Sequence, residues 1–173
     1  DTVSEPEATT IKDSNQATPD VIEPAHTTKE TISEPSEYEV MRTNSIAKKN
    51  RAIQTKLEKV LNYTKQTMVA YMSEEDLNRL CAYVAEYSSG DTLQKISPVK
   101  VDSQLKSIDI MHFGWNIGKA FGRKRIHTAT FIKNVFAQVL CDLEISTIER
   151  KMSHTESACY IKSVSYTHLR AHE

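Results

Sequence analysis

Five cations lie close together in the second half of a 173-residue chain, in a stretch without an acidic side chain. The stretch covers 110–141, and its cations are Lys119, Arg123, Lys124, Arg125 and Lys133. Because the whole chain has a net charge of −1, this positive charge is segregated and not general. A local basic field attracts phosphate oxygens even on a near-neutral protein. The stretch therefore predicts contact with a phosphate-bearing partner.

The polar residues around the basic turn 121–125 indicate how a nucleic acid would bind. Two helices joined by a short cationic turn are typical of helix-turn-helix DNA-binding proteins, in which the second helix enters the major groove. The candidate contacts are Lys119, Arg123, Lys124, Arg125, Thr128, Thr130, Lys133, Asn134 and Gln138. Asn and Gln pair with adenine, and Lys pairs with guanine. We expect duplex DNA as the partner, although a protein-binding surface or a solvated turn without a ligand has the same composition.

Three glycines spaced four residues apart, Gly114, Gly118 and Gly122, would form a smooth strip along one helix face. Glycine inside a helix costs about 1 kcal/mol relative to alanine, so three of them predict a close approach by another backbone. We expect the following helix or the helix at 46–72 to cross this close-packing strip. An unwound segment that exposes backbone amides to a ligand is the alternative. The spacing does not match a phosphate-binding loop, because the Lys-Ser/Thr pair and the preceding strand are missing.

No constellation of side chains predicts catalysis or metal binding. His112 and His127 stand alone, whereas zinc needs Cys or His clustered at spacings of two to five residues. Cys141 and Asp142, near His127, do not form a nucleophile–base set that the sequence supports. We therefore expect a non-enzymatic protein without a metal or a cofactor.

The three cysteines, Cys81, Cys141 and Cys159, are odd in number and far apart, which favours free thiols in a reducing compartment, the first two buried. No apolar run approaches the ~20 residues of a membrane span. We expect a cytoplasmic protein without a membrane segment.

The spacing of apolar residues predicts an all-α fold within one domain at 45–162. A helix over 46–72 and a second one that starts at Ser73 should form a helical hairpin at 45–90, which Gly90 closes. A three-helix, helix-turn-helix-like unit should follow at 102–152. Its expected elements are a helix from about 102 to 121 with Trp115 largely buried, a helix over 128–140, and a short helix opened by a capping box of Ser146 and Glu149.

The first 44 residues differ from the rest in composition. They hold four of the five prolines, with three basic and ten acidic residues, a net of −7. Such a Pro/Thr/Ser-rich segment cannot bury enough apolar surface to offset its ordering entropy, which predicts a disordered acidic tail at 1–44. The body at 45–162 has a net charge of +6, from eighteen basic and twelve acidic residues. An adaptor that binds another protein through helix 46–72, with no nucleic acid, is the alternative function, and the oligomeric state stays open.

Two blocks resemble known sequences. HFGWNIG at 112–118, ATFIKNVF at 129–136 and STIERK at 146–151 resemble a block of short, uncharacterised helical bacterial proteins associated with conjugative or mobile elements. The resemblance covers about 105–155 and implies a setting beside DNA-handling genes, hence a DNA-associated accessory or regulatory protein. The final run, 164–173, resembles the translated sequencing-adapter tail of metagenomic proteins, so we expect 163–173 to be a non-native tail.

Overall fold

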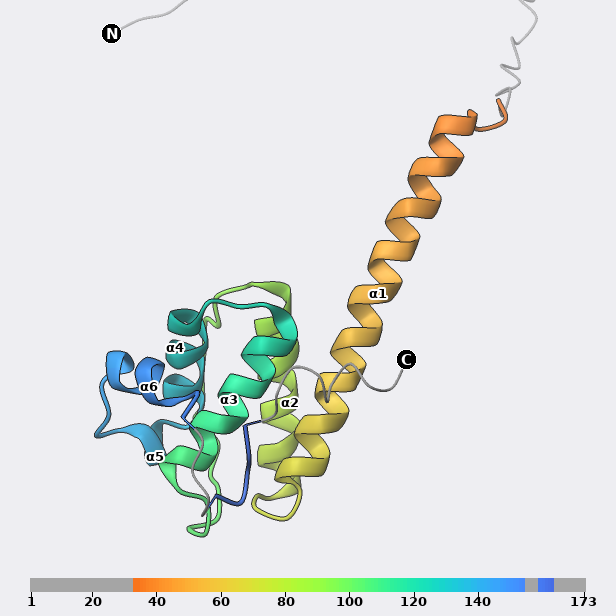
Figure 1. The fold of residues 1–173 in the computed structure, drawn as a ribbon. Helices are drawn as coiled ribbons and strands as arrows, with labels where there is room; N and C mark the ends of the chain where they lie inside the picture. The colour runs from red at the N-terminus through yellow and green to blue at the C-terminus, as the bar shows by residue number, and fades with distance from the viewer. Residues whose placement is uncertain (1–32, 155–158, 164–173) are drawn as a thin grey trace, which may run out of the picture. The chain divides into compact units, whose positions relative to one another are not determined.

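The computed structural model describes residues 33–154 and 159–163, which form six helices and no strand (Figure 1). The all-α prediction is confirmed for these residues. All six helices belong to one unit that begins at Glu37. None of them has the length and apolar character that a membrane crossing requires. Most of the expected acidic tail, 1–32, and the expected non-native run 164–173 lie outside the described residues.

The first helix, α1 (Glu37–Met68), begins nine residues before the expected start at 46. Residues 37–44, which we expected in the disordered tail, therefore form its first two turns. Glu37 and Glu39 explain the early start, because carboxylates in a first turn interact favourably with the helix dipole. Pro35 stands just before this turn, and no proline interrupts the helix afterwards.

The second helix, α2 (Glu74–Ser89), has the ends that the sequence predicts. Ser73 caps its start, since the backbone N–H of Asp76 donates to Ser73 Oγ at 3.2 Å. Gly90 closes its end with φ of 85°, a left-handed conformation that suits glycine. The short link at 69–73 lets α2 run back along the second half of α1, as Figure 1 shows.

The helices α3 (Ser107–Phe121) and α4 (Arg125–Val135) form the centre of the core. Besides α3, α4 also contacts α2 and two short helices, α5 (Ala137–Leu140) and α6 (Ile145–Lys151). Phe113 and Phe136 are fully buried, and their rings meet edge to face with centroids 5.9 Å apart. The loop before α3 joins this core, because Val99 N donates to Val135 O at 2.9 Å.

Three details of the expected three-helix unit are wrong. The helix expected over 128–140 begins three residues earlier and breaks at Phe136, whose φ of −106° and ψ of 42° separate α4 from α5. The unit therefore contains four helices. The last of them starts after Glu144, so Ser146 and Glu149 do not form the predicted capping box. The helix expected from about 102 begins only at Ser107. Trp115, which we expected to be largely buried, is partly buried and packs against the core.

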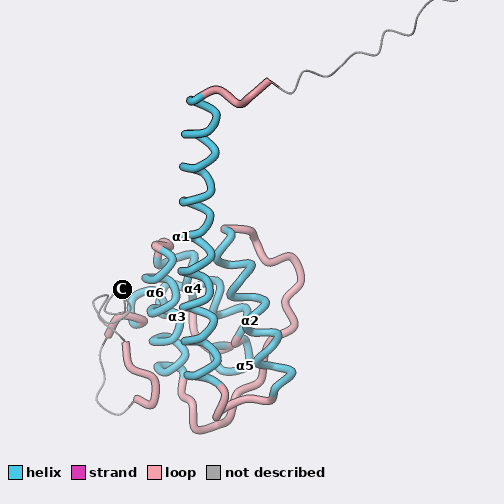
Figure 2. Tube along the Cα trace, turned by 90° about the vertical axis from the view of Figure 1, so that its right-hand side faces the viewer, coloured by secondary structure: helices cyan, strands magenta, loops and turns pink. Residues whose placement is uncertain are grey.

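The first part of α1 stands clear of the other helices (Figure 2). Every residue from 37 to 56 is exposed, and we call this segment the exposed half of α1. The second part packs against α2 and α3 through Val60, Thr64 and Met68, which are buried. A single helix is thus half core element and half solvent-exposed.

Candidate functional site

The basic turn 122–124 connects α3 to α4, and its first cation faces the protein. Arg123 donates from Nη2 to Ser88 O at 2.7 Å, and its guanidinium lies 5.9 Å from the centre of the Tyr87 ring. Ser88 belongs to the last turn of α2, whose carbonyls have no partner within the helix. Arg123 is thus a C-terminal cap of α2, which favours a cation through the helix dipole.

A second cation of the stretch caps a helix end in the same way, and a third contacts carbonyl oxygens near the end of another helix. Arg125 donates to Glu149 O at 2.5 Å, to Arg150 O and to Ser153 Oγ, and so caps α6. Lys133 Nζ lies against the carbonyl oxygens of Leu140, Cys141 and Leu143, at the end of α5 and just beyond it. Arg123 and Arg125 therefore satisfy carbonyl groups that helix geometry leaves unpaired, and Lys133 contacts carbonyl groups of the chain as well.

The remaining two cations, Lys119 and Lys124, are exposed. Lys119 Nζ lies 5.0 Å from the centre of the Trp115 ring, and Arg125 lies 5.1 Å from the same ring. The half-buried tryptophan therefore has two cations against its ring, a geometry that stabilises both. Of the expected phosphate contacts, Lys119 and Lys124 are those that make no hydrogen bond to another described residue through their ammonium groups.

The polar residues expected to contact base edges do not form one surface. Thr128 is 1% exposed and shares a hydrogen bond of 2.7 Å with the Tyr87 hydroxyl, so it belongs to the core. Thr130 donates to Ile126 O at 2.8 Å within α4. Asn134 and Gln138 are exposed, but the break at Phe136 lies between them. The contacts of α4 with four other helices leave only part of its surface open.

The glycines of the expected strip divide into two groups. A Cβ atom at Gly114 would lie 2.7 Å from Ile132 Cγ2, and one at Gly118 would lie 2.5 Å from Thr128 Oγ1. Both neighbours belong to α4, which therefore crosses α3 at these two positions. Gly122 has no such neighbour within 4 Å and instead ends α3 with φ of 65°. It serves as a helix terminator, not as part of the packing strip.

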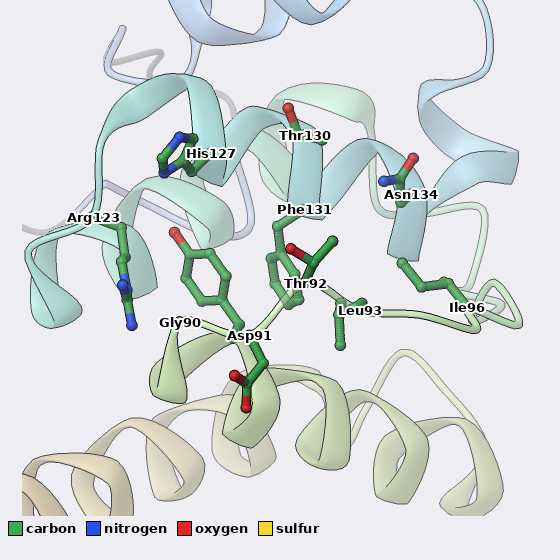
Figure 3. Close-up of a pocket in the computed structure, with 11 residues that line it drawn as sticks. Gly90, Asp91, Thr92, Leu93, Ile96, Arg123, His127, Thr130, Phe131 and Asn134 are labelled. Atoms are coloured by element: carbon green, nitrogen blue, oxygen red, sulfur yellow. The ribbon is translucent and has the colours of Figure 1, made fainter.

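A pocket of about 270 Å³ opens between α4 and the loop after α2 (Figure 3). Its lining consists of Tyr87, Gly90, Asp91, Thr92, Leu93, Ile96, Arg123, His127, Thr130, Phe131 and Asn134. Burial raises the pKa of Tyr87, more than its hydrogen bond to Thr128 and the charge of Arg123 lower it. The only carboxylate of the lining, Asp91, points away from His127, so the two do not form an acid–base pair. The sequence offered no signal for this pocket, because the loop reaches α4 only through the tertiary fold.

The remaining reactive groups are also dispersed. Among the described residues no three His, Cys, Asp or Glu side chains gather as a metal site would require. Cys81 is partly buried, which raises the pKa of its thiol, and Cys141 is exposed, so the prediction that both are buried is wrong. All three cysteines are free thiols. Unlike the cysteines, the side chain of His112 is completely buried.

No family model, curated protein or solved structure matches the chain.

Proposed function

We propose that this chain is a non-enzymatic helical adaptor that binds a partner helix along the exposed half of α1. The observation that carries the proposal is an apolar column that continues past the edge of the core. Ile46, Ile53 and Val60 are seven residues apart and so share one helix face. Val60 is 2% exposed, whereas Ile46 and Ile53 are 48% and 55% exposed. The column that packs against α2 and α3 thus has no cover in its first half.

The exposed apolar face of α1, which we call the seam, has the seven-residue repeat of two-stranded coiled coils. Asn50, Leu57 and Thr64 form a second column, also seven residues apart, beside the isoleucine column. Lys49 and Lys56 flank this second column, and both are exposed. A partner helix with apolar residues at its own seam and acidic residues beside it complements this surface. Because α2 and α3 cover the seam from Val60 onward, the contact extends over residues 37–57, about 30 Å of helix.

A DNA-associated accessory function is the second candidate. Its support is the exposed charge of α1 over 48–59, where Lys48, Lys49, Arg51, Lys56 and Lys59 oppose only Glu58. The resemblance to proteins of mobile elements supplies the setting. The basic turn 122–124 and α4 support this function less than their composition suggests, because Arg123 and Arg125 already cap helices and Lys133 already contacts carbonyl oxygens near the end of α5. A DNA contact at the turn would depend on Lys119 and Lys124.

One binding experiment with the full chain separates these two functions. The probes are a synthetic three-heptad helix, with Leu at the seam and Glu at its flanks, and a duplex DNA of mixed sequence at ~50 mM salt. The adaptor function predicts that the peptide binds and that replacing Ile46 and Ile53 together by Ser lowers affinity at least tenfold, since each buried Ile contributes about 1.5–3 kcal/mol. The matched control, Ala52→Ser on the outer face of the same helix, should bind like the wild type.

The DNA-binding measurement tests charged side chains instead of the apolar seam. DNA binding should be insensitive to the two Ile→Ser changes, and its log–log salt slope should fall by about one unit per neutralised cation in Lys48→Gln, Lys49→Gln or Lys124→Gln. Arg123 and Arg125 are unsuitable for this test because their loss also uncaps α2 and α6. Failure of the peptide to bind would contradict the adaptor function, and self-association at the same seam would replace the partner by a second copy of the chain.

A further inference from the structure

Three polar side chains on one face of α3 are almost completely buried. Asp109, His112 and Asn116 are 1%, 0% and 1% exposed, and their spacing of three and four residues places them in a row. Burial of polar groups is costly unless each has a hydrogen-bond partner. We call this row the α3 clamp, because its partners are backbone groups of a segment that lies far away in the sequence.

The α3 clamp holds the backbone of residues 161 and 162. Ile161 N donates to Asp109 Oδ1 at 3.0 Å, and Ile161 O lies 2.8 Å from His112 Nδ1. Asn116 Nδ2 donates to Lys162 O at 2.9 Å. The side chain of Ile161 is 4% exposed and belongs to the core. Hydrogen bonds to the main chain with one side chain in an apolar site are the means by which proteins bind extended peptides.

His112 makes a second contact that determines its protonation. Its Nε2 is hydrogen-bonded to His154 O, while Nδ1 is hydrogen-bonded to Ile161 O. A carbonyl oxygen can only accept a hydrogen bond, so both ring nitrogens must donate. Both nitrogens carry a proton only in the imidazolium form. A neutral ring would turn one bare lone pair toward a carbonyl oxygen, which repels it.

Titratable groups linked to the α3 clamp come from α3 itself, from α1 and from the two segments that His112 contacts. Asp109 lies one turn earlier on α3 and contacts the same residue, Ile161, through its backbone N–H. Tyr63 on α1 is linked to the α3 clamp through Asn116, and burial raises the pKa of its hydroxyl, so it adds no charge. The side chains of His154 and Lys162 are exposed. Asp109 is therefore the carboxylate of the α3 clamp among the described residues, and its hydrogen bonds go to the backbone N–H groups of Ile161 and Lys106.

We propose that the α3 clamp is a binding site for an extended peptide backbone, filled here by the chain's own residues 159–163, and that doubly protonated His112 holds this segment and releases it as the pH rises. Loss of the ring proton removes one hydrogen bond at His112 and introduces a repulsion, and release of the segment then also breaks the hydrogen bonds of Ile161 N to Asp109 and of Lys162 O to Asn116. The C-terminal segment is then a pH-dependent strap over α3. This inference is independent of the proposed adaptor function, since it involves neither the exposed half of α1 nor its partner.

Nuclear magnetic resonance of the full chain labelled with ¹⁵N-histidine tests the proposal. We expect both ring nitrogens of His112 to be protonated at low pH, and the amide of Ile161 to be protected from hydrogen exchange in that state. After correction for intrinsic exchange, this protection should fall about tenfold or more once the ring loses a proton, whereas the amide of Ile132 in the core should keep its protection.

Two variants complete the test. Gln carries both of its N–H donors on one nitrogen, so in His112→Gln it cannot replace two ring nitrogens that contact two separate carbonyls, and Ile161 should have low, pH-independent protection. His127→Gln removes an exposed histidine of α4 and should behave like the wild type in both readouts. If His112→Gln does not fold, the spectra of the wild-type chain still test the proposal. A ring with one bare nitrogen while Ile161 is protected, or an Ile161 protection that does not respond to the ring's titration, would overturn the proposal.

Discussion

Gly118 of α3 lies directly beneath Thr128 of α4, so that a Cβ atom at 118 would be 2.5 Å from Thr128 Oγ1 and 2.8 Å from Cγ2. Real Cβ atoms essentially never come this close to a neighbour, and Thr128 is held by its hydrogen bond to the Tyr87 hydroxyl. The contact of these two residues therefore sets how closely α3 and α4 approach.

Gly118→Ala should destabilise the protein although alanine is the better helix former. Alanine gains about 1 kcal/mol of helix propensity, but overpacking of a filled core costs about 1–3 kcal/mol and forces α4 outward. Chemical denaturation of both chains measures the difference. In a double-mutant cycle with Thr128→Ala, which removes both clashing atoms, the two changes should couple favourably. A Gly118→Ala variant more stable than the wild type would contradict the close approach of the helices.

Arg125 and Lys119 make a matched pair for the capping of α6. Both cations lie about 5 Å from the Trp115 ring, but only Arg125 donates to carbonyls at the end of α6. Arg125→Gln should cost about 1 kcal/mol and increase hydrogen exchange in α6, because the terminal carbonyls lose their partner. Lys119→Gln should stay within about 0.5 kcal/mol of the wild type in thermal unfolding. Equal losses of stability in the two variants would show that the contact with the Trp115 ring, and not the capping of α6, stabilises the protein.

The local signals in the sequence predicted the local structure well. The capping residue Ser73 and the terminator Gly90 lie within one turn of what they cap, so the pattern of residue types was sufficient. The role of the cations was not predictable in the same way. Arg123 and Arg125 cap helices through residues 35 and 24 positions away, and no spacing rule brings such distant segments together. A basic cluster thus has the same composition whether it binds phosphate or caps helices.

The spacing of apolar residues is also limited in what it predicts. The apolar columns of α1 predicted its helical face, but Ile46 and Val60 follow the same repeat, and only one of them is covered. The repeat identifies the apolar face and not the element that packs on it. The break at Phe136 has no Pro or Gly signal either, because a fully buried aromatic side chain and not a local preference occupies that position.

The start of α2 should make stability depend on acid pH. Burial raises the pKa of Asp76, but hydrogen bonds from Ser73 and Arg79 outweigh it and lower the pKa below its ordinary value of 3.8. A carboxyl whose pKa is lower in the folded chain contributes stability above its unfolded pKa, and this contribution disappears as the pH falls through the folded value. Asp76→Asn should therefore cost about 1 kcal/mol at neutral pH and flatten the acid limb of the stability curve. Ser73→Ala should shift the same limb to higher pH, and an unchanged acid limb in Asp76→Asn would contradict this role.

The exposed half of α1 should be far less stable than the half that follows it. A helix without tertiary contacts is marginal at this length, because most helical stability in proteins comes from packing of an apolar face. Amides at 41–56 should therefore exchange with opening free energies of about 0–1 kcal/mol, whereas those of Thr64 and Met68, which are 0% exposed, should approach the global value. Hydrogen exchange along α1 measures this gradient residue by residue. Addition of the acidic three-heptad helix should raise protection around Ile46 and Ile53 and leave Met68 unchanged. Uniform protection along α1 in the chain alone would mean that its first half is already covered, and the seam would then be unavailable to a partner.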